Sequence, residues 1–265
     1  MVMNAKKIVI LLCLLMGMVF SLQAENPTKT LSAAYTLWFP YNYQGENGKA
    51  LGFENEIFLA VMDSMKIQVE FNMLPWKRCL HALQYGETDA LVSMLMVDER
   101  KKYTIFSREP ISVSKTLLFI RRESPIVFDG SFEKLKRYSF GTTRGFSYGK
   151  KFDDADYLKK EEVLNQQAII NKVVHGRNDI GIGNQLVIMG LAEKMGLSND
   201  LKFLEPPVHM QELYVGFSRV KGLERMAEDF SEALARFKKT DDYLAILDKY
   251  GLKPGDLTTD PHFIK

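Results

Sequence analysis

The sequence has few of the residues and patterns that mark metal proteins and many enzymes. It contains two cysteines in 265 residues, and one of them, Cys13, lies in an amino-terminal segment that we expect to be removed. Cys79 is then left without a disulfide partner, and burial on the apolar face of a helix is favoured over a nucleophilic role. No Ser-His-Asp spacing, metal-ligand spacing or glycine-rich phosphate loop occurs, and the four histidines are scattered. We therefore expect neither a metal site nor a cofactor.

Long hydrophobic runs are absent from the sequence except near the amino terminus. Lys6 and Lys7 precede an apolar run over residues 8–20, which has the length of a secretory signal and is too short to span a membrane comfortably. Cleavage is expected after Ala24, although Leu22 is larger than the residue usually found three positions before a cleavage site. The pattern predicts a signal peptide over residues 1–24, with an uncleaved amino-terminal anchor as the alternative.

A surplus of one charge sign is also absent. Without residues 1–24 the chain has 33 basic and 33 acidic residues, because that segment holds two lysines and no acid. This balance gives no reason to expect a nucleic acid or a strongly anionic membrane surface as partner. The length allows one large domain or two small ones, with enough apolar residues to fill a core.

The first half of the sequence alternates strands and helices. Residues 31–38 alternate as in a strand, residues 53–62 place apolar side chains at helical spacing, and residues 67–71 form the next strand. A helix over residues 77–85 and a short buried strand over residues 89–94 follow. This order predicts a mostly parallel sheet that is covered on both faces.

The second half predicts another α/β lobe that is inserted into the first. Residues 114–121 and 212–218 are extended runs suited to cross between two lobes. Between them we expect a strand, a helix and a strand, and after them two amphipathic helices that pack back on the first lobe. These elements are placed at residues 135–140, 162–174, 179–183, 223–237 and 243–250.

The predicted fold class is therefore α/β, with two lobes, a two-strand hinge and a cleft between the lobes. The first lobe is discontinuous and comprises residues 25–117 and 214–265. The second lobe comprises residues 118–213.

One segment of the first lobe, residues 89–110, suggests where a ligand binds. Ser93 is expected at the carboxyl end of the buried strand, which is the edge where open α/β sheets bind ligands. Arg100 follows seven residues later, where a helical turn can bring its guanidinium back over the strand end, within reach of a carboxylate. A solvated charge run over residues 99–102 is the structural alternative.

Several short motifs occur in an order and spacing that resemble one known family. They are Trp38-Phe39-Pro40-Tyr41, Gly52-Phe53-Glu54, Pro75-Trp76-Lys77-Arg78, residues 86–90, Glu99-Arg100, Phe106-Ser107 with Pro110, residues 141–148 and residues 176–179. Over residues 33–252 the chain resembles the periplasmic solute-binding proteins of the amino-acid type, also called bacterial extracellular solute-binding proteins of family 3. The resemblance implies a two-lobe fold that closes around a small ligand in the periplasm.

The resemblance also implies roles for residues in both lobes. Arg100 matches the arginine that grips the ligand α-carboxylate, and Ser93 and the backbone at Leu95 match positions that bind the ligand head group. In the second lobe Phe146 and Ser147 match the turn that meets the carboxylate from the other side, with Ser147 at a helix start whose dipole favours an anion. The structural alternatives are a strand-end serine bonded to its own backbone at position 93 and an ordinary helix cap at position 147.

Aromatic and basic residues complete the predicted site. Trp76 matches a family position that packs on the ligand, and Trp38 and Tyr41 can form apolar walls of the cleft, because aromatic faces shield a ligand at small entropic cost. A place in the core is the alternative for these residues. Arg78 and Arg144 flank positions expected to face the cleft and would suit an acidic or polyanionic ligand, with a surface location as the alternative for each.

Asn184 departs from the family pattern. In amino-acid binders the residue five positions after the match to Asp179 is acidic and pairs with the ligand ammonium, whereas here it is Asn184. Burying an ammonium without an ionised partner is costly. Either another carboxylate does this work or the ligand has no α-ammonium. Asp179 itself is interpreted as a structural turn residue, in a turn that repeats the one at Asp89.

Together these features predict a periplasmic receptor that binds a small carboxylate, an amino acid or a related compound. We expect a monomer that is not an enzyme and that serves an ABC-type inner-membrane permease or a sensor. The alternative is a dehydratase-like enzyme for cyclic carboxylates on the same fold, which needs an acid in the cleft. The available acids, each equally explained by a helix or loop surface, are Glu54, Glu56, Asp98 and Glu109.

Overall fold

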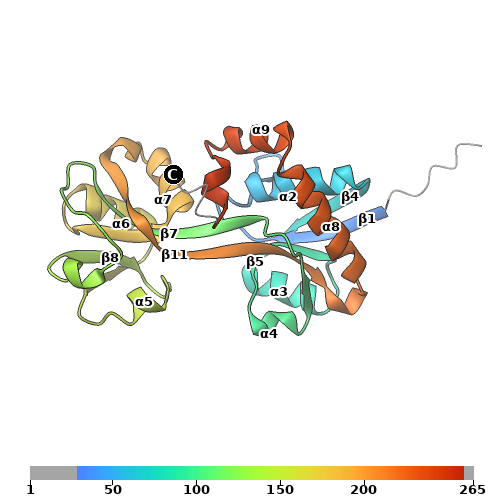
Figure 1. Cartoon of the computed structure of the whole chain (residues 1–265), viewed down its shortest axis with the longest axis horizontal. Helices are drawn as coiled ribbons and strands as arrows, with labels where there is room; N and C mark the ends of the chain where they lie inside the picture. Colours follow the sequence, from blue (N-terminus) through green and yellow to red (C-terminus); the bar gives the residue numbers. More distant parts are fainter. Residues whose placement is uncertain (1–28, 260–265) are drawn as a thin grey trace, which may run out of the picture.

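A computed structural model describes residues 29–259 of the chain. Two lobes lie side by side and are joined by a pair of long strands (Figure 1). The predicted signal peptide, its cleavage site and Cys13 lie outside the described residues. Within residues 29–259, each helix is too short or too polar to cross a membrane.

Nine strands of the described chain form one sheet that runs through both lobes. They are β1 (Lys29–Tyr35), β4 (Ile67–Met73), β5 (Ala90–Leu95), β6 (Thr104–Phe106), β7 (Ser112–Arg121), β8 (Ser139–Thr143), β9 (Lys159–Val163), β10 (Ile180–Asn184) and β11 (Leu201–Ser218). The order is β4-β1-β5-β11-β7-β10-β8-β9, with β6 also paired to β11. A small second sheet joins β2 (Tyr43–Gln44) to β3 (Ala50–Leu51).

The sequence predicted a mostly parallel sheet, but the observed sheet is mixed. Within each lobe the neighbours β4, β1 and β5, or β10, β8 and β9, run parallel. The strands β7 and β11 run antiparallel to each other and to the lobe strands next to them. The difference arises because the two crossing strands enter and leave the second lobe in opposite directions.

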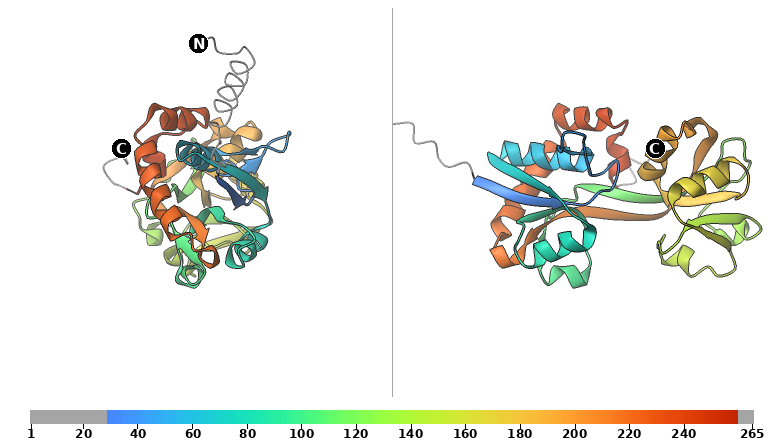
Figure 2. Two further views of the ribbon diagram at one scale, coloured as in Figure 1. Left: turned by 90° about the vertical axis from the view of Figure 1, so that its right-hand side faces the viewer. Right: turned by 180° about the vertical axis from the view of Figure 1, so that it is seen from behind.

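Helices cover both faces of the sheet in the first lobe (Figures 1 and 2). The helices are α2 (Phe53–Ser64), α8 (Glu224–Phe237) and α9 (Asp241–Lys249) on one face and α3 (Trp76–Gln84) on the other, with α4 (Asp98–Lys101) beside it. Successive strand residues point to opposite faces, so Ala33 joins the core under α2 and α8, whereas Ala34 packs with Cys79 of α3. The predicted burial of Cys79 on a helix face is confirmed.

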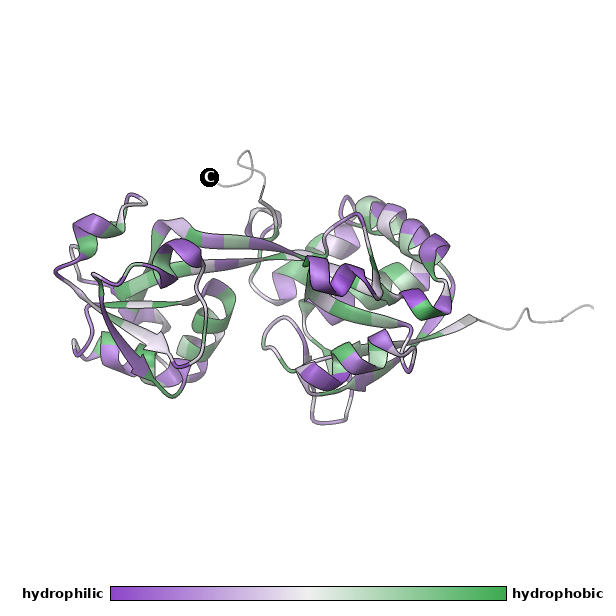
Figure 3. Ribbon diagram, turned by 90° about the horizontal axis from the view of Figure 1, so that it is seen from below, coloured by the Kyte–Doolittle hydropathy of each residue, from purple (hydrophilic) through white to green (hydrophobic). Residues whose placement is uncertain are grey.

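The second lobe surrounds its strands with α5 (Lys150–Asp153), α6 (Gln166–Val174) and α7 (Gln185–Lys194). On β10, Ile180 and Ile182 pack into one core, and Gly181 between them faces the other side. A Cβ atom at Gly181 would lie 2.2 Å from the Phe119 ring, so the glycine lets the ring lie against the strand. Figure 3 shows hydrophilic and hydrophobic residues alternating along the helices of both lobes, as expected of helices with one buried face.

The hinge consists of β7 and β11, which pair from Ser112–Leu213 to Arg121–Leu201. Their ladder is irregular between Leu204 and His209. Pro206 and Pro207 fall in this gap and lack the N–H groups that a continuous ladder needs. The predicted lobe boundaries at residues 117/118 and 213/214 both fall inside these continuous strands.

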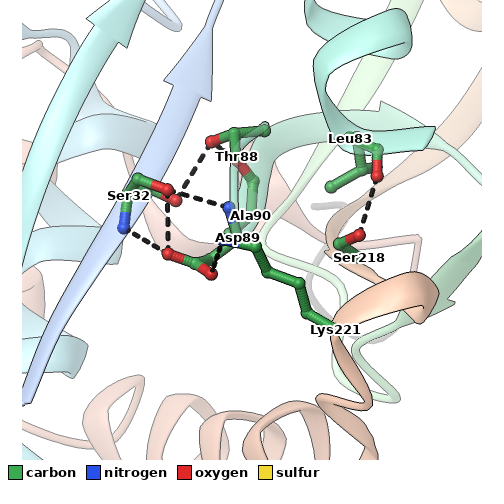
Figure 4. Close-up of polar contacts among 7 residues, drawn as sticks. All are labelled: Ser32, Leu83, Thr88, Asp89, Ala90, Ser218 and Lys221. Carbon is green, nitrogen blue, oxygen red and sulfur yellow. Dashed lines mark hydrogen bonds and ion pairs between the residues drawn. The ribbon is translucent and has the colours of Figure 1, made fainter. Parts of the chain in front are cut away.

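The same turn occurs before β5 in the first lobe and before β10 in the second. The Asp89 carboxylate accepts hydrogen bonds from the backbone N–H and hydroxyl of Ser32 on β1 (Figure 4). In the second lobe the Asp179 carboxylate accepts the equivalent two bonds from Ser139 on β8. Each aspartate therefore fixes the register of two parallel strands, which confirms the structural interpretation of Asp179. Asp89 has an additional partner, since the Lys221 ammonium lies 2.7 Å from its carboxylate.

Several elements of the second lobe differ from the sequence prediction. Residues 159–163 form an edge strand, and α6 begins only at Gln166, where the Asn165 side chain accepts a bond from the Ala168 N–H. The strand was misread because its Lys-Lys-Glu-Glu composition, which suits an exposed edge, carries no apolar alternation. Residues 132–135 form a 3₁₀ turn and β8 starts at Ser139. Helix α7 and the first half of β11 were not predicted. The other 3₁₀ turns span Ser198–Asp200, Arg219–Lys221 and Pro254–Leu257.

Candidate ligand-binding site

A cavity of about 350 Å³ lies at the carboxyl end of β5, beside the hinge. Its volume is within the range of small-molecule sites. The residues that line it are Thr36, Trp38, Trp76, Ser93, Met94, Leu95, Arg100, Ser114, Gln211 and Leu213. Five residues of the predicted site come together here, namely Trp38, Trp76, Ser93, Leu95 and Arg100. Within the described part of the chain, Arg100 is the one charged residue in this lining.

The Arg100 side chain is held in place from two sides. The residue lies on α4, and its Nη1 donates a hydrogen bond of 2.9 Å to the carbonyl oxygen of Leu95. Its guanidinium carbon lies 5.0 Å from the centre of the Trp76 ring, at cation–π distance. A guanidinium has five N–H donors, so most of them remain for an anion in the cavity. The helical turn expected to bring Arg100 back over the strand end is present. Glu99, Lys101 and Lys102 are exposed, as a solvated charge run predicts, whereas Arg100 is half-buried and lines the cavity.

Ser93 occupies a strained position on β5. Its φ angle is 68°, a conformation that is uncommon for residues other than glycine, and the pairing of β5 with β11 is irregular nearby. The distortion breaks the alternation of the strand, so that Ser93 and Met94 both line the cavity. Among residues 29–259 the Ser93 hydroxyl has no partner at standard hydrogen-bond geometry, although it lies close enough to the Glu54 carboxyl to lower the pKa of that group.

Glu54 lies beneath the cavity and was not recognised as a buried acid from the sequence. The sequence suggested a surface location, but the side chain is fully buried in the first turn of α2. Its carboxyl group accepts hydrogen bonds from Asn42 Nδ2 at 2.6 Å and from Ser112 Oγ on β7 at 2.5 Å. Burial raises the pKa of Glu54 to about 7, although these hydrogen bonds oppose the rise. Glu54 thus links the aromatic loop, the floor of the cavity and a hinge strand.

Tyr41 and Asn184 lie behind the cavity wall rather than in it. The Tyr41 ring is fully buried and stacks under Trp38, with centroids 4.0 Å apart and planes 8° apart. Asn184 Nδ2 donates to the Tyr41 hydroxyl at 3.0 Å and to Ser114 Oγ at 2.9 Å, while Asn184 Oδ1 accepts from the Val187 N–H and caps α7. Asn184 is therefore one hydrogen bond removed from the cavity, through Ser114.

A second cavity, of about 310 Å³, lies between the lobes and shares Trp38 with the first. It is lined by Leu37, Trp38, Phe39, Thr143, Phe146, Leu164, Asn165, Gln166, Gln167, Val187, Leu191 and Lys194. Phe146, which was predicted as part of the second-lobe clamp, is 56% exposed here, and Leu37 and Leu164 are 65% and 77% exposed. Trp38 borders both cavities, so the two lie next to each other.

Besides Tyr41 and Asn184, three predicted residues lie outside both cavities. Ser147 is exposed and its hydroxyl donates to Asp153, while the short helix α5 begins later, at Lys150, and is capped by Gly149. The expected helix start at Ser147 is therefore wrong. Arg144 is exposed, 3.7 Å from Glu162, and Arg78 is exposed on the outer side of α3.

The four acids considered for catalysis also lie outside these two cavities. Glu54 is buried below the first cavity, as described above. The other three are paired with lysines at 2.6 to 2.9 Å, as Glu56 with Lys249, Asp98 with Lys101 and Glu109 with Lys238. Among residues 29–259 no group of three or more potential metal ligands occurs. A larger cavity, of about 460 Å³, lies against α7 in the second lobe and contains none of the predicted site residues.

Sequence reasoning missed the contribution of the hinge strands to the site. Ser114 on β7 and Gln211 on β11 are directly opposite each other in the ladder, and both line the first cavity. Ser114 began the extended run that was assigned to the crossing. A polar residue at the start of a strand that enters a cleft was the available signal.

Comparisons with known families and solved structures show what this chain is similar to. The family described as bacterial extracellular solute-binding proteins, family 3, matches residues 32–253. The arginine-binding periplasmic protein of Mannheimia haemolytica is 26% identical over 246 residues, which cover 91% of this chain and 97% of the relative. The L-cystine solute receptor of Neisseria gonorrhoeae, in an unliganded open conformation, superposes with a TM-score of 0.69 at 22% identity, covering 85% of this chain and 92% of the receptor.

A sensor protein shares the same architecture. A histidine kinase sensor domain with similarity to periplasmic binding proteins superposes with a TM-score of 0.64 at 21% identity, covering 87% of this chain and all of the domain. At these identities the superpositions show the fold alone. The predicted two-lobe α/β fold is confirmed.

Proposed function

Since the chain belongs to the bacterial extracellular solute-binding proteins of family 3, we propose that it is a periplasmic receptor whose two lobes close on a small carboxylate. The lining of the first cavity is the observation that supports a carboxylate ligand. Within the described residues, that lining holds one arginine and no acidic side chain, so it favours an anion and disfavours a cation.

The arrangement of donors supports the same ligand chemistry. Arg100 is oriented by the Leu95 carbonyl and by the Trp76 ring, which leaves a planar set of N–H donors that matches a carboxylate. The Ser93 hydroxyl, which has no standard hydrogen bond within residues 29–259, is a second donor on the same wall. Trp38 and Trp76 would enclose the rest of the ligand with flat apolar faces.

The lobes and hinge supply the closing movement that such a receptor needs. The first cavity belongs to the first lobe and hinge, while the adjoining cavity brings in Phe146 and other residues of the second lobe. Rotation about β7 and β11 would press the second lobe onto a ligand held by Arg100. Delivery to an ABC-type permease and presentation to a membrane sensor are both served by such a closed form.

Calorimetry on the full-length mature protein tests the proposal. A thermal-shift screen against amino acids, dicarboxylates and cyclic acids supplies the ligands to be titrated, because a ligand that binds only the native state raises the melting temperature. Arg100→Ala is expected to weaken binding of any carboxylate found by about 2–5 kcal/mol, the typical loss for one partner of a buried charge pair.

Two comparisons make the result specific. Arg78→Ala removes an arginine that is nearby on α3 but exposed outside the cavity, and its affinity should match that of the parent protein. Arg100→Lys keeps the charge but loses the planar fork, so it should fall between the two. An Arg100→Ala protein with unchanged affinity would refute the assignment, and turnover of a bound cyclic acid would point to an enzyme instead.

A further inference from the structure

The two adjoining cavities differ in chemistry, and together they describe a more specific ligand. The first holds Arg100, and the second holds Lys194, yet within the described residues neither lining contains an aspartate or a glutamate. The second cavity instead gathers three large apolar side chains that are more than half exposed, Leu37, Phe146 and Leu164. We infer that the ligand is a carboxylate with an apolar body and no ammonium group. This inference rests on the proposed function and names the class of ligand for the same cleft.

Within the described residues, the two cavities offer an ammonium no counter-charge. Burying an ammonium without an ionised partner is costly, because the ammonium loses its hydration. The acid below the cavity is Glu54, which has no exposed surface; its carboxyl group accepts hydrogen bonds from Asn42 and Ser112 and lies close to the Ser93 hydroxyl of the cavity lining. Glu54 therefore offers a ligand no direct contact.

Asn184 does not supply the missing charge. Its side chain amide is neutral, its Oδ1 is used to cap α7 through the Val187 N–H, and its Nδ2 points donors toward Tyr41 and Ser114. The Asn184 side chain therefore presents donors, not a free acceptor, toward the cavity wall at Ser114. An ammonium, which carries three donors and no acceptor, finds no match there.

The apolar side chains of the second cavity give the other half of the inference. Large hydrophobic residues scattered singly on a surface need no explanation, but a group of them facing one cavity marks a binding surface. Leu37 lies on the first lobe, and Phe146 and Leu164 lie on the second. A ligand held at Arg100 would extend past Trp38, which borders both cavities, and its apolar end would be covered by these side chains when the lobes close.

Matched pairs of probes separate the carboxylate from the ammonium. 3-Phenylpropionate and L-phenylalanine differ only in the α-amino group, as do 4-methylpentanoate and L-leucine. In titration calorimetry with the mature protein, each acid is expected to bind at least tenfold more tightly than its amino-acid partner. An amino acid that binds more tightly than its matched acid overturns the inference, while loss of that binding in Arg100→Ala would leave the proposed function standing.

A substitution at Asn184 should shift the binding preference from the acids toward the amino acids. Asp is as good a helix cap as Asn, and an aspartate can accept bonds from the Tyr41 and Ser114 hydroxyls, so Asn184→Asp should fold with the parent melting temperature. It places a carboxylate one hydrogen bond from the cavity. The ratio of acid to amino-acid affinity should fall at least tenfold in each pair, and an unchanged ratio in a folded variant contradicts the role given to Asn184.

Substitutions at two similarly exposed residues test whether the second cavity binds an apolar part of the ligand. Leu164→Ser should weaken 3-phenylpropionate binding about tenfold, whereas Val127→Ser, at a residue 79% exposed and outside both cavities, should leave it unchanged. If the two variants bind 3-phenylpropionate with equal affinity, the claim that the ligand has an apolar body is refuted. Tighter binding of glutarate than of either apolar acid would also refute it. If the protein binds a different carboxylate through Arg100 and none of the four probes, the inference about the ligand class is refuted but the proposed function stands. Carboxylate binding that is indifferent to Arg100→Ala overturns the proposed function as well.

Discussion

Replacing Glu54 by glutamine tests whether the acid beneath the cavity carries a proton in the folded protein. Glutamine has nearly the same shape, and its amide can accept from Asn42 and donate to Ser112, so both observed hydrogen bonds can be kept. The substitution therefore removes the ionisation of position 54 with little change in packing. Its effect on stability should depend on pH.

The size and sign of the effect follow from the pKa of Glu54. Burial raises this pKa from 4.5 to about 7 in the folded protein, whereas the unfolded chain keeps the ordinary value. Between these two values the folded state binds a proton that the unfolded state has released, so the free energy of unfolding falls as the pH rises. The stabilisation is fully present below about pH 4.5 and is lost as the pH rises through about 7, and the difference is about 3 kcal/mol.

Urea unfolding of both proteins across pH 4.5 to 8 measures this difference. The two proteins share every other ionisable group, so subtracting their stability profiles isolates Glu54. Relative to the parent, Glu54→Gln should gain about 3 kcal/mol between the acid and the alkaline end of the series. A difference that stays constant with pH, or that changes in the opposite direction, would refute the claim that the carboxyl group is buried with its proton.

Two further experiments test how the lobes are built. Gly181→Ala places a Cβ 2.2 Å from the Phe119 ring, and urea unfolding should show a loss of about 1–3 kcal/mol from overpacking; a loss below about 0.5 kcal/mol would mean that the ring moves freely. Partial burial opposes ionisation of Asp89, but hydrogen bonds from Lys221 and from β1 lower its pKa overall, so its stabilisation exists at neutral pH and is lost as the pH falls below about 4. Asp89→Asn should therefore cost about 1–3 kcal/mol at pH 7, and the cost should shrink in acid. Asp179→Asn should cost less, because the Asp179 carboxylate is exposed and has no lysine partner among residues 29–259; equal losses would contradict the contribution of Lys221.

The elements that the sequence predicted well are those whose apolar pattern is set by one partner surface. Helix α8 buries a single stripe against the first-lobe sheet and was placed within one residue of its observed start. The edge strand β9 and the first half of β11 were missed because their residues are largely exposed or interrupted by Pro206 and Pro207. Burial pattern carries no signal where a strand has no buried face.

The site was predictable where one side chain decides the chemistry. The place of Arg100 in the cavity lining could be predicted because its charge, its distance from a strand end and its neighbours all favour anion binding, which stays a prediction. Tyr41 and Trp38 could not be separated in this way, since both are aromatic and only the stacked packing shows that Trp38 faces the cavity while Tyr41 lies below it. The burial of Glu54 depended on long-range contacts with Ser112 on the hinge, which local sequence does not encode.

The two partners of Asp89 have a consequence for the order in which the protein is made. Ser32 precedes Asp89 by 57 residues and Lys221 follows it by 132, and the whole second lobe lies between Asp89 and Lys221. In a chain that emerges from its amino terminus, the second lobe can complete its sheet with the first half of β11 while the first lobe still lacks the second half of β11 and α8. Until then β5 has an open edge where β11 will pair, and such edges invite association with other chains. The first lobe to be synthesised is therefore the last to be finished, and it is the part that a newly made molecule must protect longest.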